Sequence, residues 1–125
     1  MFAVAPRSLP GQNGGMTRFA LLALLPLPVL ADAPVVEAAW LADGAVHVTL
    51  SHPDSGWDHY ADGWEVIDAA GTRLGFRELW HPHVEEQPFT RSLRPARPLP
   101  EGPLFVRARC SVDGWNGAIV PLRSD

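Results

Sequence analysis

The chain has a single cysteine, Cys110, so no disulfide can form within it. Its stability must therefore come from packing, even in an oxidising compartment that would permit disulfides. Both methionines, Met1 and Met16, lie in the first sixteen residues, so the rest of the chain offers no thioether ligand. A lone cysteine and the lack of methionine argue against a Cu(I) carrier and against an iron–sulfur site.

Lysine is absent, and all 10 basic residues are arginines. Fourteen acidic residues and eight of the arginines follow Ala31, which gives that part of the chain a formal charge of −6. An acidic domain repels nucleic acid and anionic lipid, so we expect neither as a partner. A partner protein or a glycan remains open.

The N-terminal region has the pattern of a secretory signal peptide. Arg18 precedes an apolar run over residues 19–30, and small residues follow, as in an export signal. A cut after Ala31 fits best, and a cut after Ala33 also fits. Beyond this region no apolar run approaches the length of about eighteen residues that a membrane-spanning helix needs.

The expected organisation is a leader followed by one domain. Residues 1–31 form the leader, with Met16 as the better start because it sets a basic residue directly before the apolar run. Residues 32–125 form a single domain, which we expect to be periplasmic or secreted and free of the membrane after processing.

From Pro34 onward the pattern is that of β-strands separated by turns, and no window keeps an apolar period of 3.6 residues. Asp43-Gly44 and Ala70-Gly71 lie between such runs and predict hairpins, whereas the proline-rich segment 94–103 cannot join a ladder. The expected strands are 35–41, 45–51, 63–69, 72–80, 89–94, 104–110 and 118–122.

Seven strands in about 90 residues favour an immunoglobulin-like or fibronectin type III-like sandwich. The lack of a cysteine pair favours the fibronectin type III side of this class. In such a sandwich Trp64 is the expected buried tryptophan of the third strand. Cys110 points inward, which favours a small buried apolar residue over a metal ligand or a reactive thiol. The fold class is therefore predicted as an all-β, seven-stranded antiparallel sandwich.

Strand directions alternate in this fold, so the loops 52–62, 81–88 and 111–117 should meet at one end. Histidines and acids gather there, whereas His47 lies within a strand and is expected to be solvated. The residues of this predicted rim are His52, His59, His81 and His83 with Asp54, Asp58, Glu85, Glu86 and Asp113.

Imidazole and carboxylate together suit Zn²⁺ or Cu²⁺. Pro82 favours an extended conformation for the residue before it, which sets His81, His83 and Glu85 on one face. We therefore predict a metal site formed by the four rim histidines, with an auxiliary carboxylate, from His52, His59, His81, His83 and Glu85 or Asp58. A polar loop that is merely rich in histidine is the alternative.

Three tryptophans on the same rim give a hypothesis of another class. Trp57, Trp80 and Trp115 could stack on a sugar or hold a peptide, or could plug the open end of the sandwich. A purely structural accessory domain is a third interpretation. Catalysis is not expected, because the chain has no nucleophile elbow, no glycine-rich phosphate loop and no helix for a metalloprotease pair.

The segments SHPDSGWDHYADGWEV (51–66) and HPHVEEQPFTRSL (81–93) resemble a group of small exported proteins from marine and photosynthetic alphaproteobacteria. The resemblance covers about residues 36–122, and it implies secretion and a compact domain without assigning a catalytic residue. Those proteins often carry an acid at the position of Cys110 and a histidine near Asp113. This chain departs from them there, so the resemblance gives no ligand from its third loop.

Overall fold

The computed structural model describes residues 33–124, which form two β-sheets and no helix. The predicted leader lies outside these residues. No helix long and apolar enough to cross a membrane occurs in the part of the chain that the structure describes. The strands are β1 (Val35–Ala42), β2 (Ala45–Ser51), β3 (Ala61–Asp68), β4 (Arg73–Glu78), β5 (Phe89–Leu93), β6 (Leu104–Cys110), β7 (Gly114–Trp115), β8 (Val120–Pro121) and β9 (Arg123–Ser124).

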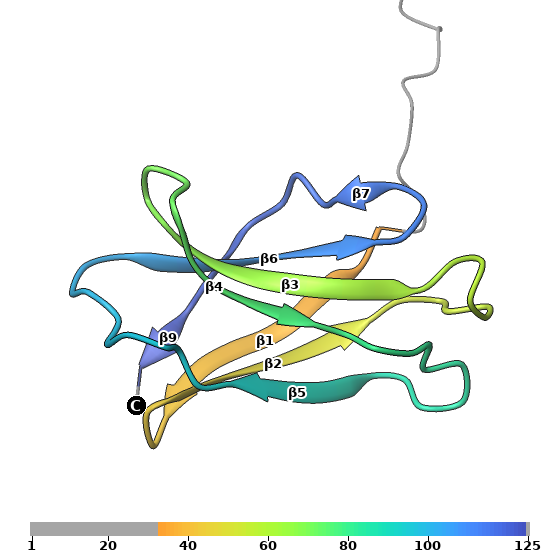
Figure 1. The fold of residues 1–125 in the computed structure, drawn as a ribbon, viewed down its shortest axis with the longest axis horizontal. Helices are drawn as coiled ribbons and strands as arrows, with labels where there is room; N and C mark the ends of the chain where they lie inside the picture. The colour runs from red at the N-terminus through yellow and green to blue at the C-terminus, as the bar shows by residue number, and fades with distance from the viewer. Residues whose placement is uncertain (1–32, 125) are drawn as a thin grey trace, which may run out of the picture.

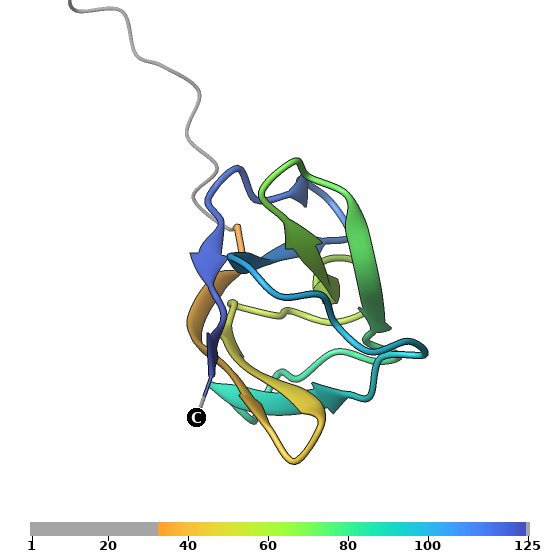
Figure 2. The same ribbon diagram turned by 90° about the vertical axis from the view of Figure 1, so that its left-hand side faces the viewer.

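The two sheets pack face to face as layers of a sandwich (Figure 1). One sheet has the strand order β5-β2-β1-β9, and the other has the order β4-β3-β6-β7 with β8 also paired to β6. Figure 2 looks onto the end that carries the β1–β2 and β3–β4 turns. The all-β, two-sheet prediction is confirmed.

Alternation along the strands explains the core. On β2, Val46, Val48 and Leu50 are at most 1% exposed, while the residues between them face outward, as the two-residue period of a strand requires. Trp64 on β3 is fully buried, as predicted. Truncating such a side chain to alanine costs about 3–5 kcal/mol.

The C-terminal segment differs from the prediction of one strand over 118–122. It is divided into three short strands, of which β8 pairs with β6 while β9 pairs in parallel with β1. Pro121 lacks the amide hydrogen that a continuous ladder needs, and the chain passes from one sheet to the other just after it. The local pattern predicts that this segment is extended, but it does not predict that the segment pairs first with β6 and then with β1.

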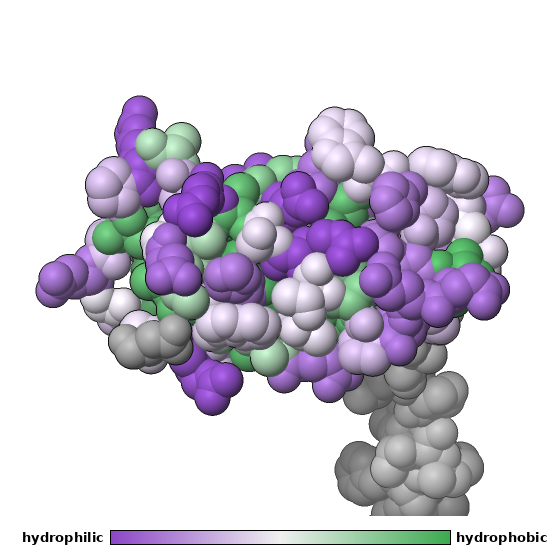
Figure 3. Space-filling view, turned by 90° about the horizontal axis from the view of Figure 1, so that it is seen from below, coloured by the Kyte–Doolittle hydropathy of each residue, from purple (hydrophilic) through white to green (hydrophobic). Residues whose placement is uncertain are grey.

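The outer surface of the β5-β2-β1 layer is polar. Seen from below, hydrophilic and intermediate residues cover most of this face (Figure 3). The alternating strands therefore turn their apolar side chains to the other layer and leave this face to water.

The loops β2–β3, β4–β5 and β6–β7 meet at one end of the sandwich, on the right in Figure 1. Hydrogen bonds join them: the amide of His83 donates to Asp54 Oδ2 at 2.7 Å, and the amide of Ser111 donates to the carbonyl of Tyr60 at 2.9 Å. The predicted convergence of three loops is confirmed.

Candidate metal centre

Three potential ligands meet beneath these loops. His52 follows β2, His59 lies in the β2–β3 loop, and Cys110 is the last residue of β6. One ligand atom from each lies within 4.8 Å of the others. These three side chains therefore lie close enough together to hold one ion.

The β2–β3 loop folds back on itself and so brings His59 to His52. The amide of Ser55 donates to the carbonyl of His59 at 3.0 Å, and the amide of His59 donates to the carbonyl of Gly56 at 3.2 Å. Gly56 has a φ of 145°, a conformation that side chains disfavour and glycine accepts. The two imidazole rings then lie edge to face with centroids 4.9 Å apart.

A buried carboxylate orients His52. Asp54 Oδ1 lies 2.5 Å from His52 Nδ1 and also accepts the amide hydrogen of Ala61 at 2.9 Å. Nδ1 therefore carries the hydrogen, and Nε2 is left with a lone pair. This Nε2 is buried and has no hydrogen-bond partner. A carboxylate behind one ring nitrogen is the usual support for a histidine that binds a metal through the other.

The thiol of Cys110 completes the group. It is fully buried, and its Sγ lies 3.4 Å from His59 Nε2. The amide of Asp113 donates to Sγ at 3.1 Å, which ties the β6–β7 loop to the thiol. Asp113 Oδ2 also lies 3.8 Å from His59 Nε2. The β6–β7 loop thus places a carboxylate beside the group, at a loop for which the resemblance gave no ligand.

His83 makes other contacts. Its ring stacks on Phe89 with centroids 3.8 Å apart and 12° between the planes. Arg91 Nη2 donates to His83 Nε2 at 2.9 Å, so the ring hydrogen is on Nδ1, which lies 3.9 Å from Asp54 Oδ2. Burial lowers the pKa of His83 below its ordinary value of 6.5, and the positive charges of Arg91 and His81 lower it further.

The remaining predicted ligands lie outside the group of three. His81 is exposed, and its Nδ1 lies 3.0 Å from the carbonyl of Pro82. Asp58 and Glu85 are exposed on their loops. Of the predicted ligands, the structure therefore brings together His52 and His59, and the third member of the group is Cys110.

The alternation in β6 favours a buried apolar role for Cys110 over a role as a ligand or a reactive thiol. The predicted inward direction of the Cys110 side chain is confirmed, since it is fully buried. The position of Cys110 at the end of β6 is the signal that could have indicated a role as a ligand. An inward side chain at the last position of a strand lies next to the loops at that end. Cys110 can therefore be buried and still contact a histidine of a loop.

The predicted tryptophans do not form one surface. Trp57 and Trp80 are each 68% exposed, so Trp57 does not plug the end of the sandwich. The ring of Trp115 instead lies against three arginines on the outer side of the β3-β6 layer, with the guanidinium carbons of Arg107, Arg109 and Arg73 at 4.8, 5.5 and 5.7 Å from its centroid.

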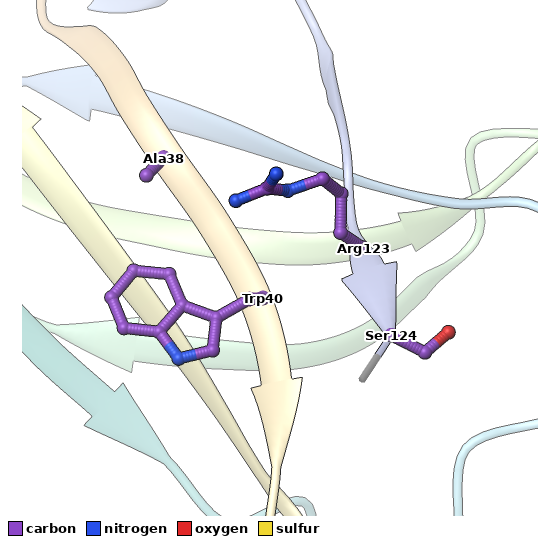
Figure 4. A pocket seen from close by; sticks show the side chains of 4 residues that line it. All are labelled: Ala38, Trp40, Arg123 and Ser124. Atoms are coloured by element: carbon purple, nitrogen blue, oxygen red, sulfur yellow. The ribbon is translucent and has the colours of Figure 1, made fainter.

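A shallow hollow lies away from this cluster, between β1 and β9. Figure 4 shows Arg123 reaching from β9 towards Ala38 on β1, with the indole of Trp40 below it. Trp40 also stacks on His47, with centroids 5.3 Å apart. The hollow has a single charged lining residue and no pair of metal ligands, so the chemistry of interest lies beneath the loops and not in this depression.

No family model matches the chain. Over 94 residues it is 42% identical to a protein from the archaeon Halomicrobium mukohataei that is named "Putative lipoprotein", and the match covers 70% of this chain and 45% of that protein. The chain therefore spans less than half the length of this relative. The relative is archaeal, whereas the resemblance noted above concerned alphaproteobacterial proteins.

Among solved structures, the chain is similar to a superoxide reductase (neelaredoxin) from Ignicoccus hospitalis. The TM-score is 0.43 and the sequence identity 18%, with 76% of this chain and 83% of that chain covered.

Proposed function

We propose that this protein is an exported β-sandwich protein that binds a divalent transition metal ion through His52, His59 and Cys110. The observation that carries the proposal is the buried Nε2 of His52, which has no hydrogen-bond partner. His52 is also one of the three residues, with His59 and Cys110, that are close enough to hold one ion. A buried imidazole nitrogen without a partner is costly, and a bound cation removes that cost.

The donor set suits a borderline ion. Two neutral imidazoles and a thiolate are ligands that Zn²⁺ and Cu²⁺ both accept. The ligands come from a tight loop and from a strand end that are joined by hydrogen bonds, which limits how far they must move. We assign the protein to binding, delivery or sensing of the ion and not to turnover.

Two observations support the proposal that the protein is exported. The N-terminal sequence has the pattern of a signal peptide, and the archaeal relative is named as a lipoprotein. We also infer an immunoglobulin-like or fibronectin type III-like fold, because two sheets enclose Trp64 on β3 in the manner of that class. Their strands are antiparallel except for the β1–β9 pair.

Calorimetric titration with Zn²⁺ and Cu²⁺ tests the metal proposal. The protein should bind one ion per chain, and Cys110→Ala or His52→Ala should abolish binding. His81→Ala is the matched control, since it removes an exposed imidazole from the same end of the molecule. Full binding by Cys110→Ala together with loss of binding by His81→Ala would refute this ligand set and favour the loop site expected from the sequence.

A carbohydrate- or protein-binding role is the second candidate, because Trp57 and Trp80 are both exposed on loops at one end. Exposed aromatic rings of this kind stack on sugars and on peptide side chains. Under this proposal Trp57→Ala should lose a signal on a glycan array that Cys110→Ala retains. Absence of any glycan or peptide signal would leave a structural accessory domain as the remaining alternative to metal binding.

A further inference from the structure

Asp113 lies against one edge of the proposed metal site. It is three residues beyond Cys110 in the β6–β7 loop, and its side chain is 26% exposed. Its Oδ2 lies 3.6 Å from Cys110 Sγ and 3.8 Å from His59 Nε2. The same residue donates its amide hydrogen to Sγ, so its backbone and side chain both face the thiol.

The separations match those between the ligands of a tetrahedral ion. Bonds of about 2.3 Å to sulfur and about 2.0–2.2 Å to nitrogen or oxygen place the ligand atoms roughly 3.3–3.7 Å apart. The observed distances are 3.4 Å from Sγ to His59 Nε2, 3.6 Å from Sγ to the carboxylate and 3.8 Å from the carboxylate to Nε2. Three edges of such a tetrahedron are therefore close to the required length. The group that includes His52 is wider, with ligand atoms within 4.8 Å of one another, so it must contract when an ion binds.

The charge balance of the ligand set also favours a carboxylate as the fourth ligand. A divalent ion held by two neutral imidazoles and one thiolate leaves an excess positive charge in a buried site, which is unfavourable in a low-dielectric environment. One further carboxylate makes the site neutral. Without an ion, the Cys110 thiol donates a hydrogen bond to this carboxylate at 3.6 Å. When an ion displaces the thiol hydrogen, the same two atoms become adjacent anionic ligands for it.

Other nearby acids are less suited to this role. Both oxygens of Asp54 are already engaged, by His52 and the amide of Ala61 on one side and by the amide of His83 on the other. Asp58 and Glu85 are exposed on their loops. Asp113 is the acid with contacts to two members of that group.

We propose that Asp113 is the fourth ligand, and that it closes a neutral, four-coordinate site of the kind that Zn²⁺ occupies, with no position left for an external ligand. The inference rests on the proposed function, which supplies the other three ligands. With Asp113 as the fourth ligand, the bound ion must be one that accepts a tetrahedral set of two nitrogens, one sulfur and one oxygen. The fourth ligand also makes the site one that holds its ion and does not present it to a substrate.

Co²⁺ is the probe, because its visible spectrum reports both the thiolate ligand and the coordination number. The full processed protein loaded with Co²⁺ should show a thiolate charge-transfer band and the strong visible bands of a four-coordinate ion, and added azide should leave them unchanged. Asp113→Ala should keep the charge-transfer band, gain sensitivity to azide and bind Co²⁺ less tightly. The loss should at least equal the roughly tenfold loss that removal of an outer-shell partner causes.

Two variants control the experiment. Glu85→Ala removes the same charge from a neighbouring loop and should behave as wild type. Asp113→Asn keeps the size of the side chain, so it should fold as wild type does and become sensitive to azide. Azide sensitivity in the wild type, or spectra of both Asp113 variants that match the wild type with and without azide, would overturn the role of Asp113 and leave the three-ligand site standing. A wild type without the charge-transfer band would instead refute the metal site, and the role of Asp113 with it.

Discussion

At the scale of single residues, Asp54 links the two histidine-bearing loops. It accepts hydrogen bonds from His52, from the amide of Ala61 and from the amide of His83, and it is 6% exposed. The sequence places Asp54 on the rim among the acids that accompany the histidines, but contacts between loops far apart in the sequence define its role. The contact between the Cys110 thiol and His59 could not be predicted for the same reason.

Replacing Asp54 tests this role. Asp54→Asn cannot accept all three hydrogen bonds, because one oxygen becomes a donor amide. We expect a loss of unfolding free energy of about 1–3 kcal/mol and a fall in metal affinity of roughly 10–100-fold. Urea denaturation and metal titration measure the two effects, with Asp58→Asn on the exposed part of the same loop as control. Unchanged metal affinity in Asp54→Asn would show that the carboxylate does not orient His52.

His83 makes stability depend on pH. Its folded pKa is lower than 6.5, first because of burial and then because of Arg91 and His81, so below pH 6.5 the unfolded chain binds more protons than the folded one. Stability is therefore complete above pH 6.5 and falls as the pH drops from there through the folded pKa. His83→Gln, which still accepts from Arg91, should reduce this fall in metal-free protein. Chemical denaturation at a series of pH values gives the slope, and equal slopes for both proteins would contradict the assignment.

At the scale of elements, the sequence predicted the long strands well because burial on one face imposes a period of two residues. Both β2 and β6 have the predicted bounds. The segment after Asn116 could not be predicted in this way. Its pairing with β6 and then with β1 depends on distant partners, and a run of a few residues carries no pattern that specifies them.

The tight β2–β3 loop is the element that sets the position of His59. Gly56→Ala should be strained at a φ of 145°, at a cost of about 1–3 kcal/mol, and should weaken metal binding by displacing His59. Gly117→Ala is the matched control, because a Cβ there meets nothing within 4 Å and its φ is not in the positive region. Thermal denaturation and metal titration of both variants test this. Equal stability and affinity for Gly56→Ala and wild type would show that the loop conformation does not position the ligand.

At the scale of the whole molecule, the antiparallel long strands of two layers bring residues 52, 59 and 110 to one end (Figure 1). The sequence predicted this meeting of loops because antiparallel connections alternate between the two ends of a sandwich. It did not predict which side chains turn inward there, since this depends on packing between loops. The metal site is therefore a property of the complete fold and not of a local motif.

The central claim is that the folded protein, through Cys110 and the two imidazoles, binds a divalent ion that the unfolded chain does not hold in the same way. The most direct measurement is thermal unfolding of wild type and Cys110→Ser with and without Zn²⁺. Zinc at about 100 times the dissociation constant should stabilise the wild type by about 2.7 kcal/mol and leave Cys110→Ser unchanged. Equal stabilisation of both proteins, or of neither, would contradict the account.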